Sequence, residues 1–336
     1  MTTQIVYSKE FAKHNNPGHP ENAKRLEIML DNIKKANFSD KIEFIKPDIL
    51  PENKLYDIHS KKMINQIKEI SAVEDSWIDL DTYVCKNDFE TARLAAGGLL
   101  KLCENVLNNK AENAYGLVRP PGHHATMKRS MGFCLFNNTA IAANEISKKG
   151  KKVLVFDPDV HHGNGTQDIF YERKDVMYQS FHLYPHFPGT GDINEIGNNK
   201  GKGYTINTPL AYGNGNKAAR QLMDEIFIPT AKKFKPDIII ISVGYDSHHS
   251  DPLGGLKLTS NFYAEIIEKF QKVQPKIVST IEGGYNLKWI GKCLISQIGQ
   301  MIDEPKKFED KIEKEKNDAP KIIKELKEKL SCYWSI

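Results

Sequence analysis

Short runs of β-branched and apolar residues recur along the chain, separated by longer segments with helical periodicity. A strand that is apolar at nearly every position is buried on both faces, as happens when helices cover both sides of a parallel sheet. The intervening segments place apolar residues at i, i+3 and i+4, as amphipathic helices do. The sequence therefore predicts a doubly wound α/β fold. The expected strands are residues 4–7, 114–118, 153–156, 176–181, 238–243 and 277–281, and the expected helices are 25–36, 59–71, 89–107, 139–148, 217–234 and 261–273.

The chain of 336 residues is long enough for two domains, but the pattern favours one. No linker rich in proline, glycine or serine interrupts the alternation before about residue 299, and no internal repeat is present. We expect a single domain over residues 1–336 with its core over about 4–300. Residues 304–330 are rich in Lys and Glu with a sparse apolar stripe, which indicates a solvated helix packed on the domain, an interaction tail being the alternative.

Composition excludes several classes of protein. A hydrophobic fraction of 40% rules out wholesale disorder, and 47 Lys and Arg against 43 Asp and Glu give no support for a dedicated nucleic-acid binder. Five scattered cysteines without a CxxC pair argue against a disulfide framework or a thiolate zinc site and indicate a reducing compartment. No apolar run approaches the roughly 20 residues of a membrane span. We therefore expect a cytoplasmic protein that does not enter a membrane.

Four of the expected strands end abruptly in glycine, histidine and aspartate. The segments that follow them are RPPGHH (119–124), DPDVHHGNG (157–165), GYDSHHSDP (244–252) and EGGY (282–285). In open α/β sheets the ligand crevice lies at the carboxyl ends of the strands. These four segments are therefore expected to converge on one site.

One of these segments has the pattern of a metal site. Asp157, Asp159 and His161 alternate at period two, so they point to one face if the strand continues. A carboxylate and an imidazole with one more oxygen ligand leave a position open for water, as a catalytic zinc requires. Asp251, after the next apolar strand, is the expected third ligand. The alternative is that the two aspartates cap a turn and His161 is an ordinary loop residue.

The other segments carry candidate acid, base and hydrogen-bond donors. His123 and His124 form an adjacent pair, and acyl transfer by metal-activated water needs a base and an acid. Adjacent loop histidines are also often merely exposed. Tyr285 follows Gly283 and Gly284, which allow close approach of the backbone to a ligand. Its phenol could donate to a developing oxyanion, or its ring could simply be packed.

The motifs RPPGHHA, MGFCLFNN, VFDPDVHHGNGTQ, FPGTGD, GYDSHHSDPLGGL and EGGYN follow one another in this order. They resemble the zinc-dependent histone deacetylase family, which includes acetylpolyamine amidohydrolases and acetoin-utilisation proteins. The resemblance covers about residues 7–299, and the N-terminal PGHPENAKR resembles the class II and prokaryotic branches. It implies the three-layer arginase-like fold, with one parallel eight-stranded sheet between helices.

The resemblance also implies a set of metal ligands. It places Asp159, His161 and Asp251 as the ligands of one catalytic Zn²⁺. It further implies a structural K⁺ near the zinc, whose expected ligands are Asp157, Asp159, His161, Ser180 and Phe181.

Catalytic roles follow from the same resemblance. His124 is expected to be the general base and then the acid, His123 an electrostatic partner near the leaving group, and Tyr285 the residue that polarises the scissile carbonyl. Asp157 is expected to orient His123, and Asn164 to orient His124. Because some relatives carry Asp where Asn164 stands, we expect a lower pKa for His124 than in those relatives.

For the substrate, the resemblance implies a tunnel around an acyl-lysine. Phe133 and Phe187 are its expected aromatic walls, with Gly132 and Gly284 allowing passage, although each Phe could be simple core. Further expected contacts are Asp81 for the substrate backbone (Asp79 being the alternative), Leu258 beside the acyl-lysine, His19 and Glu21 at the entrance, and Arg25 beneath the zinc.

The expected activity is zinc-dependent removal of acetyl or related acyl groups from lysine side chains of proteins or peptides. An acetylpolyamine deacetylase would use the same machinery but favours an acidic gate, whereas residues 254–258 (GGLKL) are neutral to basic. A dinuclear manganese ureohydrolase is disfavoured, because its motifs read D-x-H-x-D. A catalytically inactive acyl-lysine-binding protein is the non-enzymatic alternative, and it predicts a missing ligand, His or Tyr. The sequence leaves the oligomeric state open.

Overall fold

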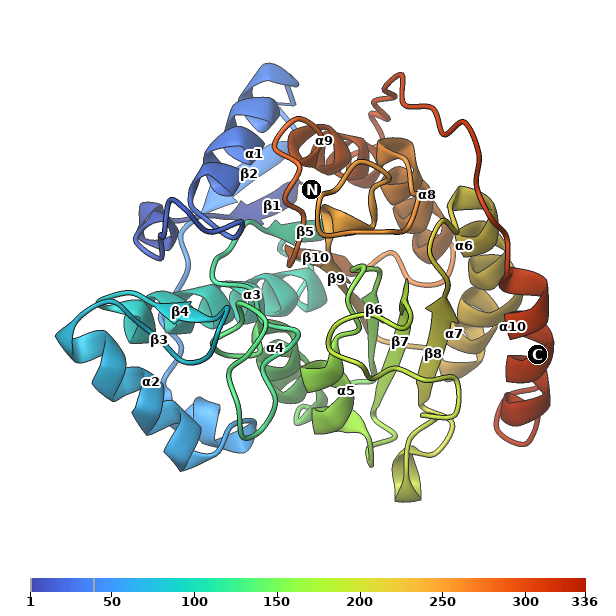
Figure 1. Ribbon diagram of the computed structural model, residues 1–336, viewed down its shortest axis with the longest axis horizontal. Helices are drawn as coiled ribbons and strands as arrows, with labels where there is room; N and C mark the ends of the chain where they lie inside the picture. Colours follow the sequence, from blue (N-terminus) through green and yellow to red (C-terminus); the bar gives the residue numbers. More distant parts are fainter. Residues whose placement is uncertain (1, 39) are drawn as a thin grey trace.

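A single parallel sheet of eight strands forms the centre of the computed structural model, which describes residues 2–38 and 40–336 (Figure 1). Its strand order is β2-β1-β5-β10-β9-β6-β7-β8, and every neighbouring pair is parallel. This confirms the predicted fold class. The strands are β1 (Thr3–Val6), β2 (Ile42–Ile45), β5 (Asn113–Gly116), β6 (Val153–Asp157), β7 (Val176–Leu183), β8 (Thr205–Leu210), β9 (Ile238–Val243) and β10 (Ile277–Ile281).

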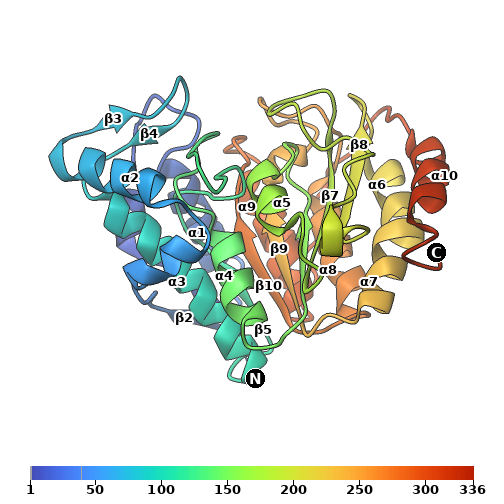
Figure 2. The same ribbon diagram turned by 90° about the horizontal axis from the view of Figure 1, so that it is seen from below.

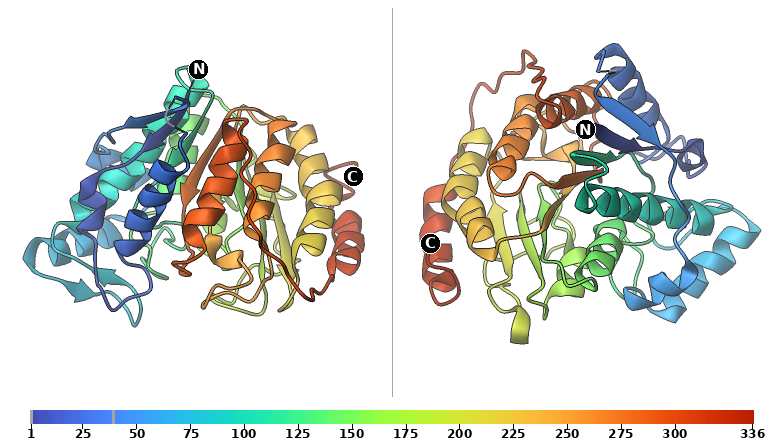
Figure 3. Two further views of the ribbon diagram at one scale, coloured as in Figure 1. Left: turned by 90° about the horizontal axis from the view of Figure 1, so that it is seen from above. Right: turned by 180° about the vertical axis from the view of Figure 1, so that it is seen from behind.

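Helices cover both faces of the sheet. In Figures 1 and 3, α1, α9, α8 and the α6–α7 run lie on one side, and α3, α4 and α5 lie on the other, with α2 outside α3. The central strands are buried along their whole length, because helices exclude water from both faces. The helices are α1 (Lys24–Lys35), α2 (Lys61–Val73), α3 (Asp88–Leu107), α4 (Asn138–Ser147), α5 (Asn164–Phe170), α6 (Asn216–Leu222), α7 (Ile228–Phe234), α8 (Ser260–Gln271), α9 (Ile290–Met301) and α10 (Ala319–Leu330).

The six expected strands and six expected helices are all present, with shifts at their ends, but the sequence analysis missed two strands of the main sheet, two helices and the small hairpin described below. The edge strands β2 and β8 escaped because β2 is largely exposed and β8 (TINTPL) is rich in polar residues. Helix α5 is only seven residues long. Helix α9 (IGKCLISQIGQM) keeps an amphipathic pattern that the sequence analysis overlooked. The helix expected over 217–234 contains a π-helical turn at Met223–Phe227, just before Pro229, which has no N–H for a regular helical bond.

The C-terminal segment is only partly helical. Its expected helix is confirmed as α10, whose apolar stripe packs against α6. Most of residues 304–318 instead has no regular secondary structure and runs along the surface (Figure 3). Hydrogen bonds tie this segment to the body, for instance from Asn261 Nδ2 to the Phe308 carbonyl and from Lys316 N to the Gly213 carbonyl.

A small antiparallel hairpin stands apart from the main sheet. Its strands are β3 (Ser76–Trp77) and β4 (Tyr83–Val84), and it lies at the upper left of Figure 2 beside α2. Leu80 at its tip is fully exposed. Among the helices of the described ranges, none combines the length and the apolarity that a bilayer crossing requires.

Candidate active site

A cavity of about 340 Å³ opens beyond the carboxyl ends of β5, β6, β9 and β10. All four segments that the sequence analysis singled out contribute to its lining, as the rule for open parallel sheets requires. The lining residues are Asp81, Pro121, His123, His124, Gly132, Phe133, Cys134, His161, His186, Phe187, Pro252, Leu253, Gly254, Gly283 and Tyr285.

Three possible metal ligands meet close to this cavity. One ligand atom each from Asp159, His161 and Asp246 lies within 4.8 Å of the others. Strand β6 ends at Asp157, and the chain then turns so that Asp159 Oδ1 accepts hydrogen bonds from His161 N (2.9 Å) and Nδ1 (3.1 Å). His161 Nδ1 is also 3.4 Å from Asp246 Oδ2. The Asp159–His161 pairing predicted from the sequence is therefore present.

The third member of this cluster is Asp246, and the expected Asp251 was wrong in this respect. Asp246 comes three residues after the end of β9, so the sheet itself places it beside Asp159. Asp251 lies further along the loop, and its carboxylate accepts hydrogen bonds from backbone N–H groups. Its Oδ2 accepts from Tyr285 N (2.7 Å) and Asn286 N (2.9 Å), and its Oδ1 accepts from Leu253 N (3.0 Å). Asp251 therefore holds the loop that carries Tyr285.

The Asp159–His161–Asp246 cluster has the donor chemistry of a divalent cation site. Asp246 Oδ2 is buried and accepts no hydrogen bond from any described residue. Burial, and then the neighbouring Asp159 carboxylate, raise the pKa of Asp246, as expected where two carboxylates lie side by side in the interior. Gly283 leaves room there, because a Cβ at this position would collide with both carboxylates. Two carboxylates and one imidazole suit Zn²⁺ with an open coordination position.

The histidine pair lies against this cluster with its two members in different states. His123 Nδ1 is 3.1 Å from Asp157 Oδ2, and although burial opposes its charge, the carboxylates of Asp159 and Asp157 raise its pKa to about 10. His124 Nδ1 is 2.8 Å from Asn164 Oδ1, an acceptor, so Nδ1 carries the hydrogen and Nε2 keeps a lone pair. Burial, then the charges of His123 and His161, hold the pKa of His124 well below its usual value. His124 is therefore neutral and can accept a proton.

Tyr285 completes the polar end of the cavity. Burial raises the pKa of its phenol, so the hydroxyl keeps its proton and can donate. Arg25 braces the segment before it, donating from Nε to the Gly284 carbonyl (2.8 Å) and from Nη2 to the Glu282 carbonyl (2.6 Å). The Arg25 guanidinium also lies 5.0 Å from the Tyr285 ring centroid. Arg25 thus acts beneath the site, as expected, and is itself paired with the buried carboxylate of Glu21.

Aromatic rings form the walls of the cavity, as the sequence predicted. Phe187 meets the His124 ring edge to face at 5.0 Å, and Phe133 meets the Tyr285 ring in the same way at 5.8 Å. Gly132 lies between these walls with φ +56°, where a Cβ would press on the His124 ring and on Phe187. A slender, apolar stem such as the lysine side chain fits between such walls.

Asp81, the carboxylate expected at the substrate backbone, lines the cavity. The alternative, Asp79, instead closes the hairpin turn, since its Oδ1 accepts from Asp81 N (3.1 Å) and Thr82 N (2.7 Å). The hairpin is tied to the cavity wall through a hydrogen bond from Phe133 N to Thr82 Oγ1 (3.2 Å).

Four residues that were expected in the tunnel or at its entrance are not where the sequence analysis placed them. Leu258 is 1% exposed and bridges to His248 beneath the loop, and Leu253 lines the cavity instead. His19 is buried behind Phe133, with its Nε2 3.1 Å from the Asp81 carbonyl, so it supports the wall rather than the entrance. Glu21 and Gly284 are likewise buried and do not appear in the cavity lining, where Gly283 takes the place expected of Gly284.

Several lining residues were missed by the sequence analysis. Cys134, Pro121 and His186 flank residues that it did name, so their proximity in sequence was the available signal. Of the residues expected at a potassium ion, Asp157 and Ser180 are register partners on β6 and β7. The Phe181 side chain is fully buried in the core, so only its backbone could take part.

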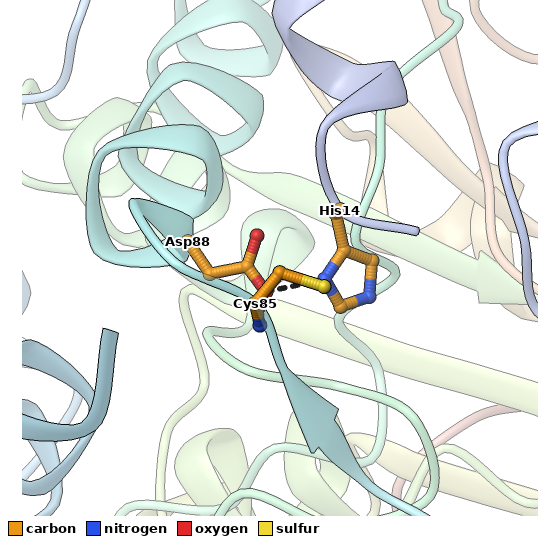
Figure 4. Close-up of side chains that lie close together, drawn as sticks. All are labelled: His14, Cys85 and Asp88. Carbon is orange, nitrogen blue, oxygen red and sulfur yellow. Dashed lines mark hydrogen bonds and ion pairs between the residues drawn. The ribbon is translucent and has the colours of Figure 1, made fainter. Parts of the chain in front are cut away.

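A second buried cluster, His14 with Cys85 and Asp88, lies behind the hairpin and is already internally paired (Figure 4). His14 Nδ1 is 2.5 Å from Asp88 Oδ2, and Asn15 N donates to Cys85 Sγ (3.3 Å). Burial opposes a charge on His14, but Asp88 raises its pKa to about 10, and its Nε2 is 3.4 Å from Glu21 Oε2. The cluster is therefore a charged link to the Glu21–Arg25 pair rather than a vacant ligand set.

A third group, His248, His249 and Asp310, joins the loop after β9 to the C-terminal segment. His248 Nε2 and His249 Nε2 are 2.9 and 2.6 Å from the two oxygens of Asp310. Ser250 N donates to His248 Nδ1 (3.2 Å), so Nε2 of that ring carries the hydrogen. This group is a hydrogen-bonded clamp.

Comparison with known proteins agrees with this geometry. A model of the histone deacetylase domain matches residues 19–301. A probable deacetylase of Archaeoglobus fulgidus is 34% identical over 99% of both chains. The chloroplastic histone deacetylase 10 of Oryza sativa is 36% identical over 87% of this chain and 71% of its own length. The crystal structure of the HDA15 HD domain superposes with a TM-score of 0.92 at 31% identity, covering 100% of this chain and 97% of that one. On this evidence the chain belongs to the histone deacetylase family and is a hydrolase of the deacetylase type.

Proposed function

We propose that the protein is a zinc-dependent amidohydrolase that removes acetyl or related acyl groups from lysine side chains of proteins. The observation that carries the proposal is that one aromatic-walled cavity ends at the Asp159–His161–Asp246 cluster, the neutral His124 and the Tyr285 hydroxyl together. Every role that amide hydrolysis needs is then filled by a residue. An inactive acyl-lysine binder would lack at least one of them.

Asp159, His161 and Asp246 are the residues that would hold zinc. Zinc bound there would polarise the acyl carbonyl and make water more acidic. The chain's own groups supply the rest. His124 Nε2 accepts a proton from the attacking water and returns it to the lysine nitrogen as the C–N bond breaks. Tyr285 donates a hydrogen bond to the oxyanion that develops on the carbonyl. The balanced reaction is acyl-lysine plus water giving lysine plus carboxylate.

Structural potassium is the second cofactor that we propose. Asp157 ends β6 beside Ser180 of β7, so oxygen atoms of both strands lie together close to Asp159. Oxygen ligands suit a hard monovalent cation, and this positive charge would offset the buried Asp157 carboxylate. The cytoplasmic location expected from the cysteine pattern stays a prediction.

The Tyr285→Phe variant tests the proposed function. It keeps the ring and its packing but removes the donor, so we expect normal zinc content and a loss of at least about a hundredfold in kcat, as for other single oxyanion donors. Zinc is measured by elemental analysis and kcat on an acetyl-lysine peptide. Unchanged turnover would remove Tyr285 from the mechanism.

The same assay separates the substrate classes. The wild-type protein is compared on an acetyl-lysine peptide, longer acyl-lysine peptides and an acetylated polyamine. The proposal expects the highest kcat/KM on an acyl-lysine peptide. A clear preference for the polyamine would assign the protein to small-molecule deacetylation instead.

A further inference from the structure

A second hollow, of about 520 Å³, shares walls with the active-site cavity. Met131 and Pro188 line the hollow, while their chain neighbours Gly132 and Phe187 line the cavity. At both places one segment of backbone therefore separates the hollow from the active-site cavity. The hollow is therefore within reach of residues that flank an acyl-lysine held in the cavity. The remaining residues of the hollow are Thr126, Met127, Lys128, Arg129, Asn164, Asp168 and Thr190.

The hollow carries an excess of positive charge. Lys128 and Arg129 line it, and both are exposed. The side-chain contact recorded for Arg129 is a long one to Met131 Sδ (3.9 Å), and within residues 2–38 and 40–336 neither cation forms an ion pair with a carboxylate. Asp168 is the one carboxylate in the lining. Two cations against one anion leave the hollow complementary to a further carboxylate.

The two cations stand on a preformed turn. Thr126 Oγ1 accepts hydrogen bonds from Lys128 N (3.2 Å) and Arg129 N (3.0 Å), and Thr126 N donates to the Arg129 carbonyl (2.9 Å). Ser60 N, at the start of α2, donates to the Met127 carbonyl (2.7 Å) and fixes the turn to the body of the protein. Because the turn is held in place, binding there orders little additional backbone.

The hairpin side of the cavity mouth has the opposite charge. Asp81 lines the mouth, and Asp79 lies two residues before it on the same turn. Burial and the adjacent Asp79 raise the pKa of Asp81, as expected for neighbouring carboxylates. A substrate polypeptide therefore meets carboxylates at the hairpin and cations at the hollow.

We propose that this hollow is a subsite for a carboxylate group that the substrate polypeptide carries close to its acyl-lysine, with Lys128 and Arg129 as the specificity-determining residues. The inference rests on the proposed function and adds a substrate class to it. The carboxylate can belong to an Asp or Glu side chain, or to the C-terminus of a polypeptide that ends near the acyl-lysine. Charge complementarity at such exposed sites changes selectivity and association more than overall affinity.

The first test is a scan of acetyl-lysine peptides. A single Asp is placed at each of the three positions on either side of the lysine, and each peptide is paired with its Asn counterpart. Two further peptides, with a free and an amidated C-terminus, distinguish a terminal carboxylate from a side-chain one. We expect at least one position at which the carboxylate raises kcat/KM about threefold to tenfold, chiefly through KM, with a smaller ratio at high salt.

The second test uses charge-reversal variants. Lys128→Glu/Arg129→Glu is expected to invert the Asp-to-Asn ratio at that position, and Lys128→Met/Arg129→Met to bring it close to one. Lys321→Glu/Lys324→Glu on α10 makes the same change in net charge at the far edge of the sheet and should keep the wild-type ratio. Equal kcat/KM for all Asp and Asn pairs in the wild type, or equal loss of the ratio in the α10 variant, would overturn the subsite.

A short substrate separates this proposal from the proposed function. Capped acetyl-lysine without flanking residues reaches the cavity but not the hollow. If the wild type hydrolyses it and shows no carboxylate preference in peptides, the subsite alone fails. If the wild type hydrolyses neither this substrate nor any acyl-lysine peptide, the proposed function fails.

Discussion

Two histidine pairs follow strands of the same sheet and have almost the same local geometry. The rings of His123 and His124 are 4.0 Å apart, and those of His248 and His249 are 4.4 Å apart. Only the first pair lines the cavity, and one of its members faces a neutral amide, that of Asn164. Both members of the second pair face one carboxylate, and the His248 ring stacks on the Trp289 indole.

The difference lies in the partners, which come from different parts of the chain. Asp157 and Asn164, the partners of the first pair, are the last residue of β6 and the first residue of α5. Asp310, the partner of the second pair, belongs to the irregular C-terminal segment. The same dipeptide thus lines the candidate active site in one loop and forms a structural clamp in the other, according to the groups that the fold places opposite its ring nitrogens.

The largest difference in zinc content and activity is expected between variants of Asp246 and variants of Asp251, which lie in the loop that carries the second pair. Asp246→Ala removes a carboxylate from the proposed zinc site, so we expect zinc content well below one equivalent and a loss of at least about a thousandfold in kcat/KM. Asp251→Asn is expected to keep its zinc and lose roughly tenfold, because it weakens only the support of the Tyr285 loop. Elemental analysis and peptide kinetics measure both. Full zinc content in Asp246→Ala, or its loss in Asp251→Asn, would reverse the assignment.

The next largest difference, in kcat, is expected between variants of the two histidine pairs. His124→Ala removes the proposed base, so kcat should fall by about 10² to 10⁴ while zinc content is unchanged. His249→Ala is the matched variant in the other pair and should change kcat by no more than about threefold, although its melting temperature should fall because it breaks the bond to Asp310. Comparable losses of kcat in both variants would contradict the division of roles.

The smallest effect should come from making the first pair resemble the second. Asn164→Asp places a carboxylate on His124 Nδ1, which stabilises the imidazolium and raises the pKa of His124. Since the base must be neutral, activity is lost as pH falls through this pKa, and the acid limb of kcat/KM should therefore move to higher pH, by about one unit. Asp310→Asn, the reciprocal change in the other pair, should leave the limb in place. A limb that stays put or moves to lower pH in Asn164→Asp would show that His124 is not the titrating base.

Local patterns were sufficient for the parts of the fold that depend on neighbouring residues. Continuous apolar strands and their polar ends predicted the parallel sheet, the edge at which the site lies, and the candidates Asp159, His161 and His124 at that edge. Phe133 and Phe187 were expected from the family resemblance. Elements without such a pattern were missed, such as the exposed edge strand β2 and the polar edge strand β8.

Choices between similar residues needed the three-dimensional structure. Asp246 and Asp251 lie in one loop, and so do Leu253 and Leu258, with nothing in their spacing to rank them. A loop has no fixed periodicity, so the direction of each side chain depends on the hydrogen bonds that the rest of the protein provides. Asp251 receives three backbone N–H groups, and Leu258 is drawn beneath the loop by its bridge to His248.

The sequence by itself thus determined the fold class, the family and the chemical types at the site, because hydrophobic periodicity and motif order are properties of neighbouring residues. Only the tertiary structure decided which aspartate joins the metal cluster, which histidine pair opens to the cavity, and that two free cations stand beside its mouth. Each of these depends on contacts between segments far apart in the chain, which no local pattern encodes.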